Sequence, residues 1–254
     1  MPAPNATSRF SDRVENYIRY RPGYPPEAIA VLQDECSLTP QHVIADIASG
    51  TGIWTRPLLE NGNRVFGVEP NAEMRQAGER LLERFPNFTS VTGTAEATTL
   101  GDGSVEFVTA AQAAHWFDCE RARQEFARIL KPGGWLVLLW NERLIDTTPF
   151  LHDYEQLLLT YGTDYKEVRH ERTTGAVNKF FDPAPFQERI YTLRQDFDYA
   201  GIEGRLLSSS YAPGPEHPDY PAMMRELRRI YDAHAEGGRV ACDYKTRVYF
   251  GRLA

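Results

Sequence analysis

A short apolar run that ends in an acid and leads into a glycine turn constrains this chain more than any other feature. Residues 43–52 read Val-Ile-Ala-Asp-Ile-Ala-Ser-Gly-Thr-Gly, and a helical pattern follows from Ile53 to Leu59. A second apolar run over residues 64–69 again ends in an acid, Glu69. A strand, a glycine turn, a helix, a strand and an acid in this order are typical of a nucleoside-cofactor site at the carboxyl edge of a parallel sheet.

The spacing of the glycines bears on which cofactor such a site would hold. A dinucleotide loop reads Gly-x-Gly-x-x-Gly, but here Gly50 and Gly52 are followed by Thr55 where the third glycine would stand. Glycine permits a close ligand approach that a side chain would block, and the turn directs helix N–H groups toward an anionic group. Glu69 can accept hydrogen bonds from both hydroxyls of a ribose. Its alternative role is a first-turn carboxylate that stabilises the helix beginning near Asn71.

Strand and helix patterns alternate in the first part of the chain. Expected strands lie near residues 43–48, 64–69, 88–92, 105–110 and 134–140, with helices near 52–60, 71–84 and 119–130 between them. This alternation predicts a parallel sheet with right-handed crossovers. After Asn141 the pattern is less regular: a helix near 149–161, a polar stretch over 162–180, a strand near 190–199, a helix near 219–235 and a strand near 241–253.

Composition limits the class of protein. A chain of 254 residues suits one domain, and the net charge of −7 disfavours a nucleic-acid partner. Cys36, Cys119 and Cys242 are far apart, which argues against a metal site or a disulfide framework and fits a reducing compartment. The first ten residues lack an apolar signal core and no run reaches transmembrane length, so we expect a cytoplasmic protein.

Two further polar segments complete a pattern of motifs. Gly93-Thr94-Ala95-Glu96 follows the third strand, and Ala-Gln-Ala-Ala-His-Trp-Phe-Asp at 111–118 follows the fourth. Together with Asp-x-Ala-x-Gly-Thr-Gly at 46–52, Val-Glu-Pro at 68–70, Leu-Lys-Pro-Gly-Gly at 130–134 and Tyr-Arg-Pro-Gly-Tyr-Pro at 20–25, they carry a resemblance. Over about residues 10–142 the chain resembles class I S-adenosylmethionine-dependent methyltransferases, most of all the methyltransferase domain 11 group with its trans-aconitate methyltransferase-like branch.

The resemblance implies an α/β fold: a doubly wound, mostly parallel seven-stranded Rossmann-like sheet with the last strand antiparallel, helices on both faces and a small helical cap. We expect a single methyltransferase domain over residues 1–254. Its parts would be an N-terminal helical segment at about 10–38, a cofactor-binding core at about 40–142, a cap insertion at about 143–187, and C-terminal strands and helices at about 188–254.

The resemblance also implies S-adenosyl-L-methionine as cofactor and S-adenosyl-L-homocysteine as product. Asp46 and the turn at 48–52 would hold the methionine end, Glu69 the ribose, Met74 the adenine face and the segment 94–96 the adenine edge. The full implied set is Asp46, Ala48, Ser49, Gly50, Thr51, Gly52, Glu69, Pro70, Met74, Thr94, Ala95, Glu96 and Gln112. Two positions depart from the family pattern: Ala48 replaces a glycine, and Thr94 stands where many relatives have an aspartate.

Methyl transfer from a sulfonium needs proximity, orientation and exclusion of water more than it needs a catalytic group. No metal is required, and a base is needed only for a protonated acceptor, for which His115 is the candidate. Acceptor binding is expected between the N-terminal segment and the cap, at Tyr17, Tyr20, Arg21, Tyr24, Trp116 and Trp140. Arg143 and His152 are weaker candidates, because helix capping or surface pairing explains them better.

The sequence leaves other functions open. A carboxylate or hydroxyl oxygen of a small molecule is the favoured acceptor, since an arginine can hold an acid through two parallel bonds. An NAD-type oxidoreductase is an alternative that the missing third glycine and the absence of a Tyr-x-x-x-Lys pair disfavour. A cofactor-binding protein without turnover is another. We expect no nucleic-acid or membrane partner, and a monomer or homodimer.

Overall fold

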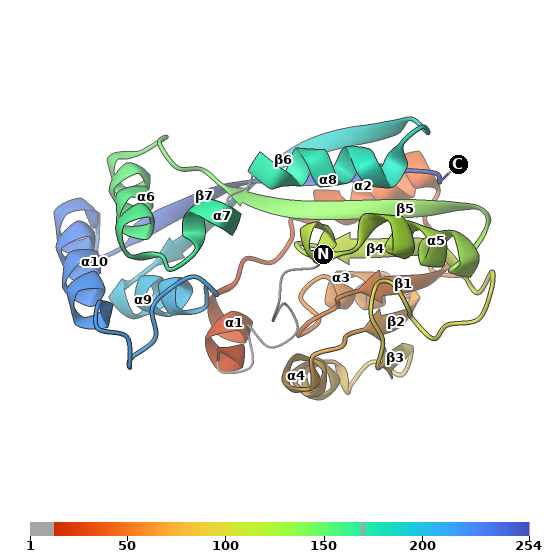
Figure 1. Cartoon of the computed structure of the whole chain (residues 1–254), viewed down its shortest axis with the longest axis horizontal. Coiled ribbons are helices and arrows are strands. Elements are labelled where there is room, and N and C mark those ends of the chain that lie inside the picture. Colours follow the sequence, from red (N-terminus) through yellow and green to blue (C-terminus); the bar gives the residue numbers. More distant parts are fainter. Residues whose placement is uncertain (1–12, 169–170, 254) are drawn as a thin grey trace.

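One seven-stranded sheet organises the computed structural model, which describes residues 13–168 and 171–253 (Figure 1). The strands are β1 Val43–Ile47, β2 Arg64–Val68, β3 Phe88–Val91, β4 Val105–Ala111, β5 Leu130–Arg143, β6 Phe186–Phe197 and β7 Val240–Gly251. Their order is β3-β2-β1-β4-β5-β7-β6. Pairing is parallel from β3 to β5, whereas β7 runs antiparallel to both β5 and β6. The predicted fold class, with the last strand of the chain reversed, is confirmed.

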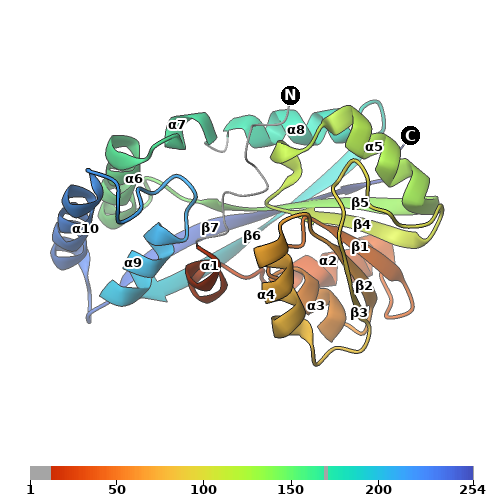
Figure 2. The same ribbon diagram turned by 60° about the horizontal axis from the view of Figure 1, so that its bottom comes forward.

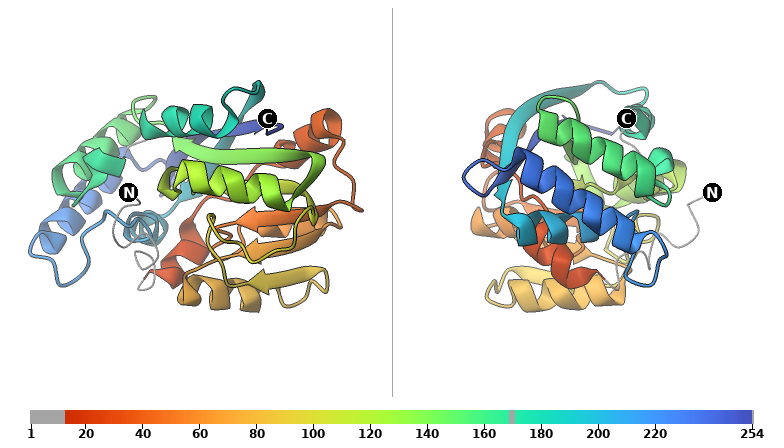
Figure 3. Two further views of the ribbon diagram at one scale, coloured as in Figure 1. Left: turned by 45° about the vertical axis from the view of Figure 1, so that its right-hand side comes forward. Right: turned by 90° about the vertical axis from the view of Figure 1, so that its left-hand side faces the viewer.

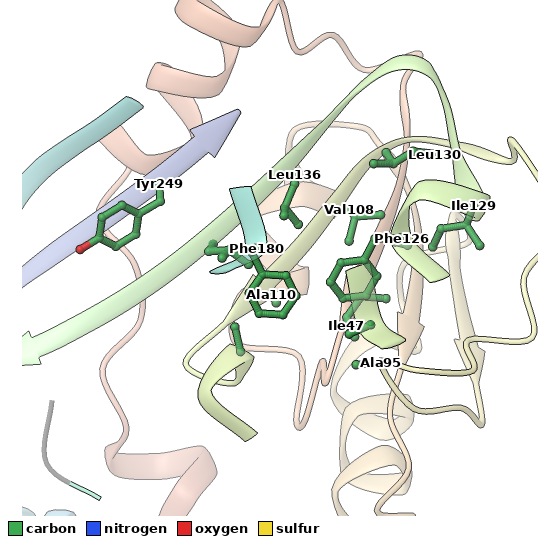
Figure 4. Close-up of a cluster of buried hydrophobic side chains, with 14 of the residues drawn as sticks. Ile47, Ala95, Val108, Ala110, Phe126, Ile129, Leu130, Leu136, Phe180 and Tyr249 are labelled. Carbon is green, nitrogen blue, oxygen red and sulfur yellow. The ribbon is translucent and has the colours of Figure 1, made fainter. Parts of the chain in front are cut away.

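Helices cover both faces of the sheet, because successive strand residues point to opposite sides. On β4, Phe107 packs with α2 Glu27–Cys36 and α3 Thr55–Glu60, while Val108 packs with α5 Cys119–Ile129. α4 Ala72–Leu82 lies on the α2 and α3 side, and α8 Glu171–Phe181 lies beside α5 on the other (Figure 2). The rings of Phe126 in α5 and Phe180 in α8 stack 5.9 Å apart over the sheet (Figure 4).

A helical lobe extends the sheet at one end. It comprises α6 Pro149–Tyr161, α7 Tyr165–Val168, α9 Tyr199–Leu207 and α10 Tyr220–His234, which lie together in both panels of Figure 3. β5, β6 and β7 are longer than the other strands, and the lobe packs on β7 around a second core that includes Tyr154, Ile202 and Leu227. The lobe therefore grows from the carboxyl end of β5, where ligands bind in sheets of this kind.

Helix α1, Val14–Tyr20, joins the lobe to the main sheet layer. Tyr20 packs directly on Gly204 of α9, since a Cβ at Gly204 would lie 2.0 Å from the Tyr20 ring. The preceding residues 10–12 of the predicted N-terminal helical segment lie outside the described residues. α1 also packs against α4, so it crosses from the lobe to the end of the sheet that carries the glycine turn.

The segment predicted as a cap, 143–187, divides between two places. Residues 149–168 form α6 and α7 in the lobe, while α8 joins the layer over the sheet and contributes Val177 and Phe181 to its core. The polar stretch 162–180 thus contains a helix that its weak periodicity did not predict. α9 was also missed, because its two glycines lower its helix propensity; Asp198 compensates by accepting a hydrogen bond from the Gly201 backbone N–H at 2.7 Å.

Candidate active site

Two adjoining hollows lie at the carboxyl ends of β1, β2 and β4. The larger, here called the main cavity, has a volume of about 360 Å³. The smaller, here called the side pocket, has a volume of about 40 Å³ and shares Tyr17, Ala48, Gly50, Ala111 and Gln112 with it. Nine of the residues predicted to bind a cofactor line the main cavity: Ala48, Gly50, Glu69, Pro70, Met74, Thr94, Ala95, Glu96 and Gln112. The side pocket adds Asp46, Ser49 and Thr51.

The turn after β1 depends on left-handed backbone conformations. Gly50 has φ 57° and Gly52 has φ 86°, and Ala48 is also in this region at φ 54°. A Cβ at Gly52 would come within 2.6 Å of the Leu82 Cδ1 atom, so glycine at this position allows α4 to pack against the turn. Gly52 lines neither hollow, and its role in the structure is this packing.

Asp46 is a buried acid held by two threonines. Its Oδ2 accepts a hydrogen bond from Thr55 Oγ1 at 2.6 Å, and its Oδ1 accepts one from Thr109 Oγ1 at 3.0 Å. Burial raises the pKa of Asp46 to about 7; the two hydroxyls lower it and the nearby Glu69 raises it further. Thr55 stands where a dinucleotide loop has its third glycine. In place of a glycine, this position therefore supplies a hydroxyl that bonds to Asp46.

Glu69 joins the glycine turn to the start of α4. Its Oε2 accepts from the Gly50 backbone N–H at 2.9 Å, and its Oε1 accepts from the Asn71 backbone N–H at 2.8 Å. Asn71 in turn caps α4 by accepting from the Met74 backbone N–H at 2.8 Å. Burial raises the pKa of Glu69, and the two backbone donors lower it. Each carboxylate oxygen keeps a further lone pair for a ligand hydroxyl.

The opposite wall of the main cavity is built from the loops after β3 and β4. Gln112 adopts φ 61°, and its side-chain Nε2 donates to the Asn141 carbonyl at 3.2 Å. Glu96 Oε1 accepts from the Asp118 backbone N–H at 2.9 Å. Glu96 therefore fixes the start of α5 against the loop that contains Thr94, in addition to facing the cavity.

The N-terminal motif at 20–25 reaches the side pocket. Arg21 and Tyr24 line it, and the Arg21 guanidinium lies 5.1 Å from the centre of the Tyr17 ring. Asn141, at the carboxyl end of β5, donates from Nδ2 to the Gly23 carbonyl at 2.8 Å and accepts from Thr246 Oγ1 at 2.6 Å. The sequence analysis did not predict that Asn141 anchors the N-terminal motif. A polar residue at the end of an apolar strand, where it is buried, is a signal for such an anchoring role.

Several predicted residues lie away from both hollows. Tyr20 packs on α9, and Trp140 is 1% exposed within the sheet core, where its ring meets that of Tyr249 at 5.9 Å. His115 does not line either hollow and lies beside Trp116, with ring centres 4.7 Å apart; Trp116 does line the main cavity. Whether each of these aromatic residues lines a hollow or packs elsewhere depends on which side of its strand or helix it occupies.

The two weaker candidates lie at the end of β5 and on α6. Arg143 forms a buried ion pair with Glu155 at 2.5 Å, and Tyr165 donates to the same Glu155 oxygen at 2.6 Å. The side chain of His152 is 60% exposed and neighbours Asp153. His152 has the surface pairing that the sequence favoured, whereas Arg143 is paired in the interior and not at the surface.

Two negative findings apply to residues 13–168 and 171–253. No group of three or more histidine, cysteine, aspartate or glutamate side chains is arranged to hold a metal ion. Within the same ranges, none of the helices combines the length and apolar character needed to cross a membrane.

The sheet order, its reversed seventh strand and the ligand-sized cavity define the Rossmann-like methyltransferase fold. A solved structure named as a candidate type II methyltransferase from Anaeromyxobacter dehalogenans shares this fold, with TM-score 0.68 and 21% identity over 92% of this chain and 98% of that one. Phosphoethanolamine N-methyltransferase 2 of Haemonchus contortus, solved with S-adenosylhomocysteine, matches with TM-score 0.53 and 14% identity over 96% of this chain and 57% of that one.

The sequence comparisons find similarity to methyltransferases over the core of the chain. Residues 45–138 match the Methyltransf_11 family, described as a methyltransferase domain. An uncharacterized methyltransferase of Mycobacterium tuberculosis is 42% identical over 134 residues, which are 53% of this chain and 52% of that protein. One from Schizosaccharomyces pombe is 35% identical over 150 residues, 59% and 58% of the two chains. The chain thus spans about half the length of the curated relatives it matches, and the trans-aconitate branch stays a prediction.

Proposed function

We propose that this protein transfers a methyl group from S-adenosyl-L-methionine to a small-molecule acceptor, with a carboxylate or hydroxyl oxygen as the favoured nucleophile. The methyltransferase family of residues 45–138 supports the reaction class. The observation that carries a nucleoside cofactor is Glu69, a buried acid bonded to the N–H groups of Gly50 and Asn71 at the wall of the main cavity. Thr55, which bonds to Asp46 where a dinucleotide loop has its third glycine, favours S-adenosylmethionine over a dinucleotide.

The residues present fit this cofactor. The main cavity lies within the size range of small-molecule sites. Glu69 would hold the ribose hydroxyls, Met74 and the segment 94–96 would contact the adenine, and Asp46 with the glycine turn would hold the methionine end. When bound, S-adenosylmethionine would supply an electrophilic methyl group: a bond from the acceptor to the methyl carbon would form as the carbon–sulfur bond breaks, with S-adenosylhomocysteine as the leaving group.

The chain's own contribution is to bind, orient and exclude water. Tyr17 from α1 and Gln112 from the loop after β4 line both hollows, so they face the junction between nucleoside and methionine sites. Holding the two reactants at the attack distance supplies most of the rate in such displacements. A carboxylate acceptor carries no proton at neutral pH, so its methylation needs no base. A hydroxyl acceptor would need one, and His115 could supply it after a movement of its loop.

The negative net charge favours a small-molecule acceptor over a nucleic acid. We also propose a cytoplasmic location and a monomeric or homodimeric state. Gel filtration with light scattering would measure the oligomeric state. The similarity covers only about half of the relatives, so it does not identify the acceptor. A screen of small acids, phenols and amines would identify it, with S-adenosylhomocysteine production as the readout.

Calorimetric titration with S-adenosylhomocysteine tests the cofactor assignment. Glu69→Ala should weaken binding by about tenfold or more, equivalent to about 1.4 kcal/mol. Glu83→Gln, which neutralises an exposed acid at the end of α4, is the matched control and should bind as the unmodified protein does. Tight binding of NAD without binding of S-adenosylhomocysteine would refute the proposal. Binding with no product from any acceptor class would favour a protein without turnover.

A further inference from the structure

Strand β6 forms one border of the sheet, and within residues 13–168 and 171–253 no strand pairs with its outer side (Figure 1). It pairs with β7 at every position from Phe186 to Phe197, without a bulge. The strand at the other border, β3, has only four residues. A long, regular edge strand presents a row of unpaired backbone N–H and C=O groups to which another strand can bond. β6 is therefore a surface that can accept a further strand.

The usual protections of an edge strand are missing from β6. Prolines, lysines and bulges commonly block an edge, but residues 186–197 contain no proline and no lysine, and their pairing is regular. Ile190 is 47% exposed, and no other large apolar side chain of the described residues is as exposed. One exposed apolar residue is ordinary on a protein surface. The position of Ile190 on an unprotected edge, however, favours a partner that covers it.

The charged side chains of β6 restrict which strand can pair with it. Glu188 and Arg194 lie on the same face of the strand as Ile190, since successive side chains alternate between the two faces. When two copies of β6 pair antiparallel, their hydrogen bonds form only if the two-fold axis passes through a residue, because the backbone groups of successive residues point to opposite sides. An axis at Tyr191 places Glu188 of each copy opposite Arg194 of the other. The two opposite-charge pairs stabilise this register.

Both charged side chains also have partners within the chain. Arg247 Nη1 donates to Glu188 Oε1 at 2.7 Å, and Arg194 Nε donates to Asp196 Oδ1 at 3.1 Å. The Arg194 side chain is 62% exposed, and its guanidinium carries several N–H groups. Arg194 can therefore bond to Glu188 of a second copy while it keeps its contact with Asp196.

Neighbouring registers fit less well. An axis at Thr192 places Glu188 of each copy opposite Asp196 of the other, so that two pairs of acids repel. An axis at Ile190 places Glu188 opposite Thr192, which leaves the charges unmatched, and the pairing then ends at Arg194. Of these three registers, the one centred between Ile190 and Thr192 alone matches opposite charges.

The other face of β6 is compatible with the same register. Tyr191 is half-buried on the core beneath α2, and an axis at this residue brings the two Tyr191 rings together. Cross-strand aromatic pairs of this kind are favourable. Glu35 of α2 forms an ion pair with Arg189 at 2.5 Å. This ion pair reduces the repulsion between the acids of the two α2 helices near the axis.

We propose that β6 pairs antiparallel with β6 of a second copy about a two-fold axis at Tyr191, which forms a homodimer with one continuous sheet. A two-fold contact uses the same surface on both copies and is closed, so β6 keeps no free edge for further assembly. No residue of β6 lines the main cavity or the side pocket. The dimer is therefore independent of the cofactor and of the acceptor.

Sedimentation velocity of the purified chain and of two charge reversals tests this interface. The unmodified protein should sediment as a dimer. Arg194→Glu and Glu188→Arg each place like charges opposite one another twice, and each variant alone should sediment as a monomer. An equimolar mixture of the two variants restores both opposite-charge pairs and should form a heterodimer. Arg84→Glu, which reverses an exposed arginine just after α4, is the matched control and should remain a dimer.

A cysteine on the axis tests the register independently of these charges. Tyr191→Cys places the two thiols opposite one another, so oxidation with diamide should give a disulfide-linked dimer. Gln187→Cys lies on the same strand but opposite Gln195, far from its own copy, and should cross-link no more than the unmodified protein.

Three results would overturn the proposal. The first is an unmodified protein that stays monomeric up to about 100 μM, a hundredfold above a micromolar Kd, which would leave the edge to a different partner. The second is a dimer that both charge reversals leave intact, which would place the contact on another surface. The third is a failure of Tyr191→Cys to cross-link, a result that decides the register even if a charge-reversal variant does not fold.

Discussion

Replacing Asp46 by asparagine should stabilise the folded protein while it weakens the site. Asp46 is 1% exposed, and burial raises its pKa from an ordinary 3.8 to about 7. The folded chain therefore binds this proton more tightly than the unfolded chain, so stability is highest at low pH and falls as pH rises from about 4 to about 7. Asparagine has nearly the same shape, carries no charge and can still bond to Thr55 and Thr109.

The magnitude follows from the pKa difference. Each pKa unit is worth about 1.4 kcal/mol, so the ionised Asp46 carboxylate lowers the free energy of unfolding by about 4 kcal/mol at pH 8. At pH 5 the same reasoning gives about 2 kcal/mol. The free energy of unfolding of Asp46→Asn should therefore exceed that of the unmodified protein by these amounts. This difference should grow up to about pH 7 and stay constant above it.

Urea unfolding of the ligand-free proteins at several pH values measures this gap. Asp34→Asn, an exposed aspartate on α2, removes the same charge and should change the free energy of unfolding by less than about 0.5 kcal/mol. An Asp46→Asn protein that is no more stable than the unmodified one at pH 8, or a gap that does not depend on pH, would refute the reasoning. Weaker binding of S-adenosylhomocysteine by the more stable variant would show that Asp46 serves ligand binding and not stability.

Four further predictions concern this site and the lobe. Calorimetric affinity for S-adenosylhomocysteine should rise from pH 6 to pH 8 as Asp46 ionises to meet the ligand ammonium group; a flat profile would contradict that contact. Thr55→Val should lower the free energy of unfolding at pH 8 by about 1–3 kcal/mol, and by less in the Asp46→Asn background, so equal losses in urea would count against the threonine's role. Arg143→Met should lower the free energy of unfolding by about 3–5 kcal/mol, because the buried Glu155 carboxylate would lose its positively charged partner; the double replacement with Glu155→Leu should recover most of this loss in the same assay. His115→Gln should keep S-adenosylhomocysteine production on a carboxylate acceptor within about tenfold, since a loss of 10²-fold or more is the mark of a general base.

The sequence predicted the parts of the fold that depend on local pattern. Apolar runs ending at Asp46 and Glu69 located β1 and β2, because parallel strands buried on both faces are nearly continuous in apolar residues. The missing third glycine at Thr55 disfavoured a dinucleotide loop. These signals lie within about thirty residues of one another and need no knowledge of distant contacts.

The parts that sequence reasoning missed depend on contacts between distant segments. Thr109 reaches Asp46 across neighbouring strands, and Asn141 bonds to Gly23, which is 118 positions away. Trp140 precedes Asn141 but points to the other face of β5, into the core. Successive side chains along a strand point to opposite faces of the sheet. The sequence alone does not show which face lies toward the site, because this depends on how the sheet packs.

The sheet continues unbroken through the lobe, and this has a consequence for how such a protein can acquire new specificity. The lobe segments leave β5 after Arg143 and return at β6, then leave β6 after Phe197 and return at β7. Their end points are fixed by strand register, with Arg143 opposite Tyr244 and Phe197 opposite Val240. The lobe helices α6, α7, α9 and α10 are thus the part of these insertions that can be replaced while the strands that carry Asp46 and Glu69 keep their pairing, whereas α8 must stay because Phe180 packs on Phe126 of the main core.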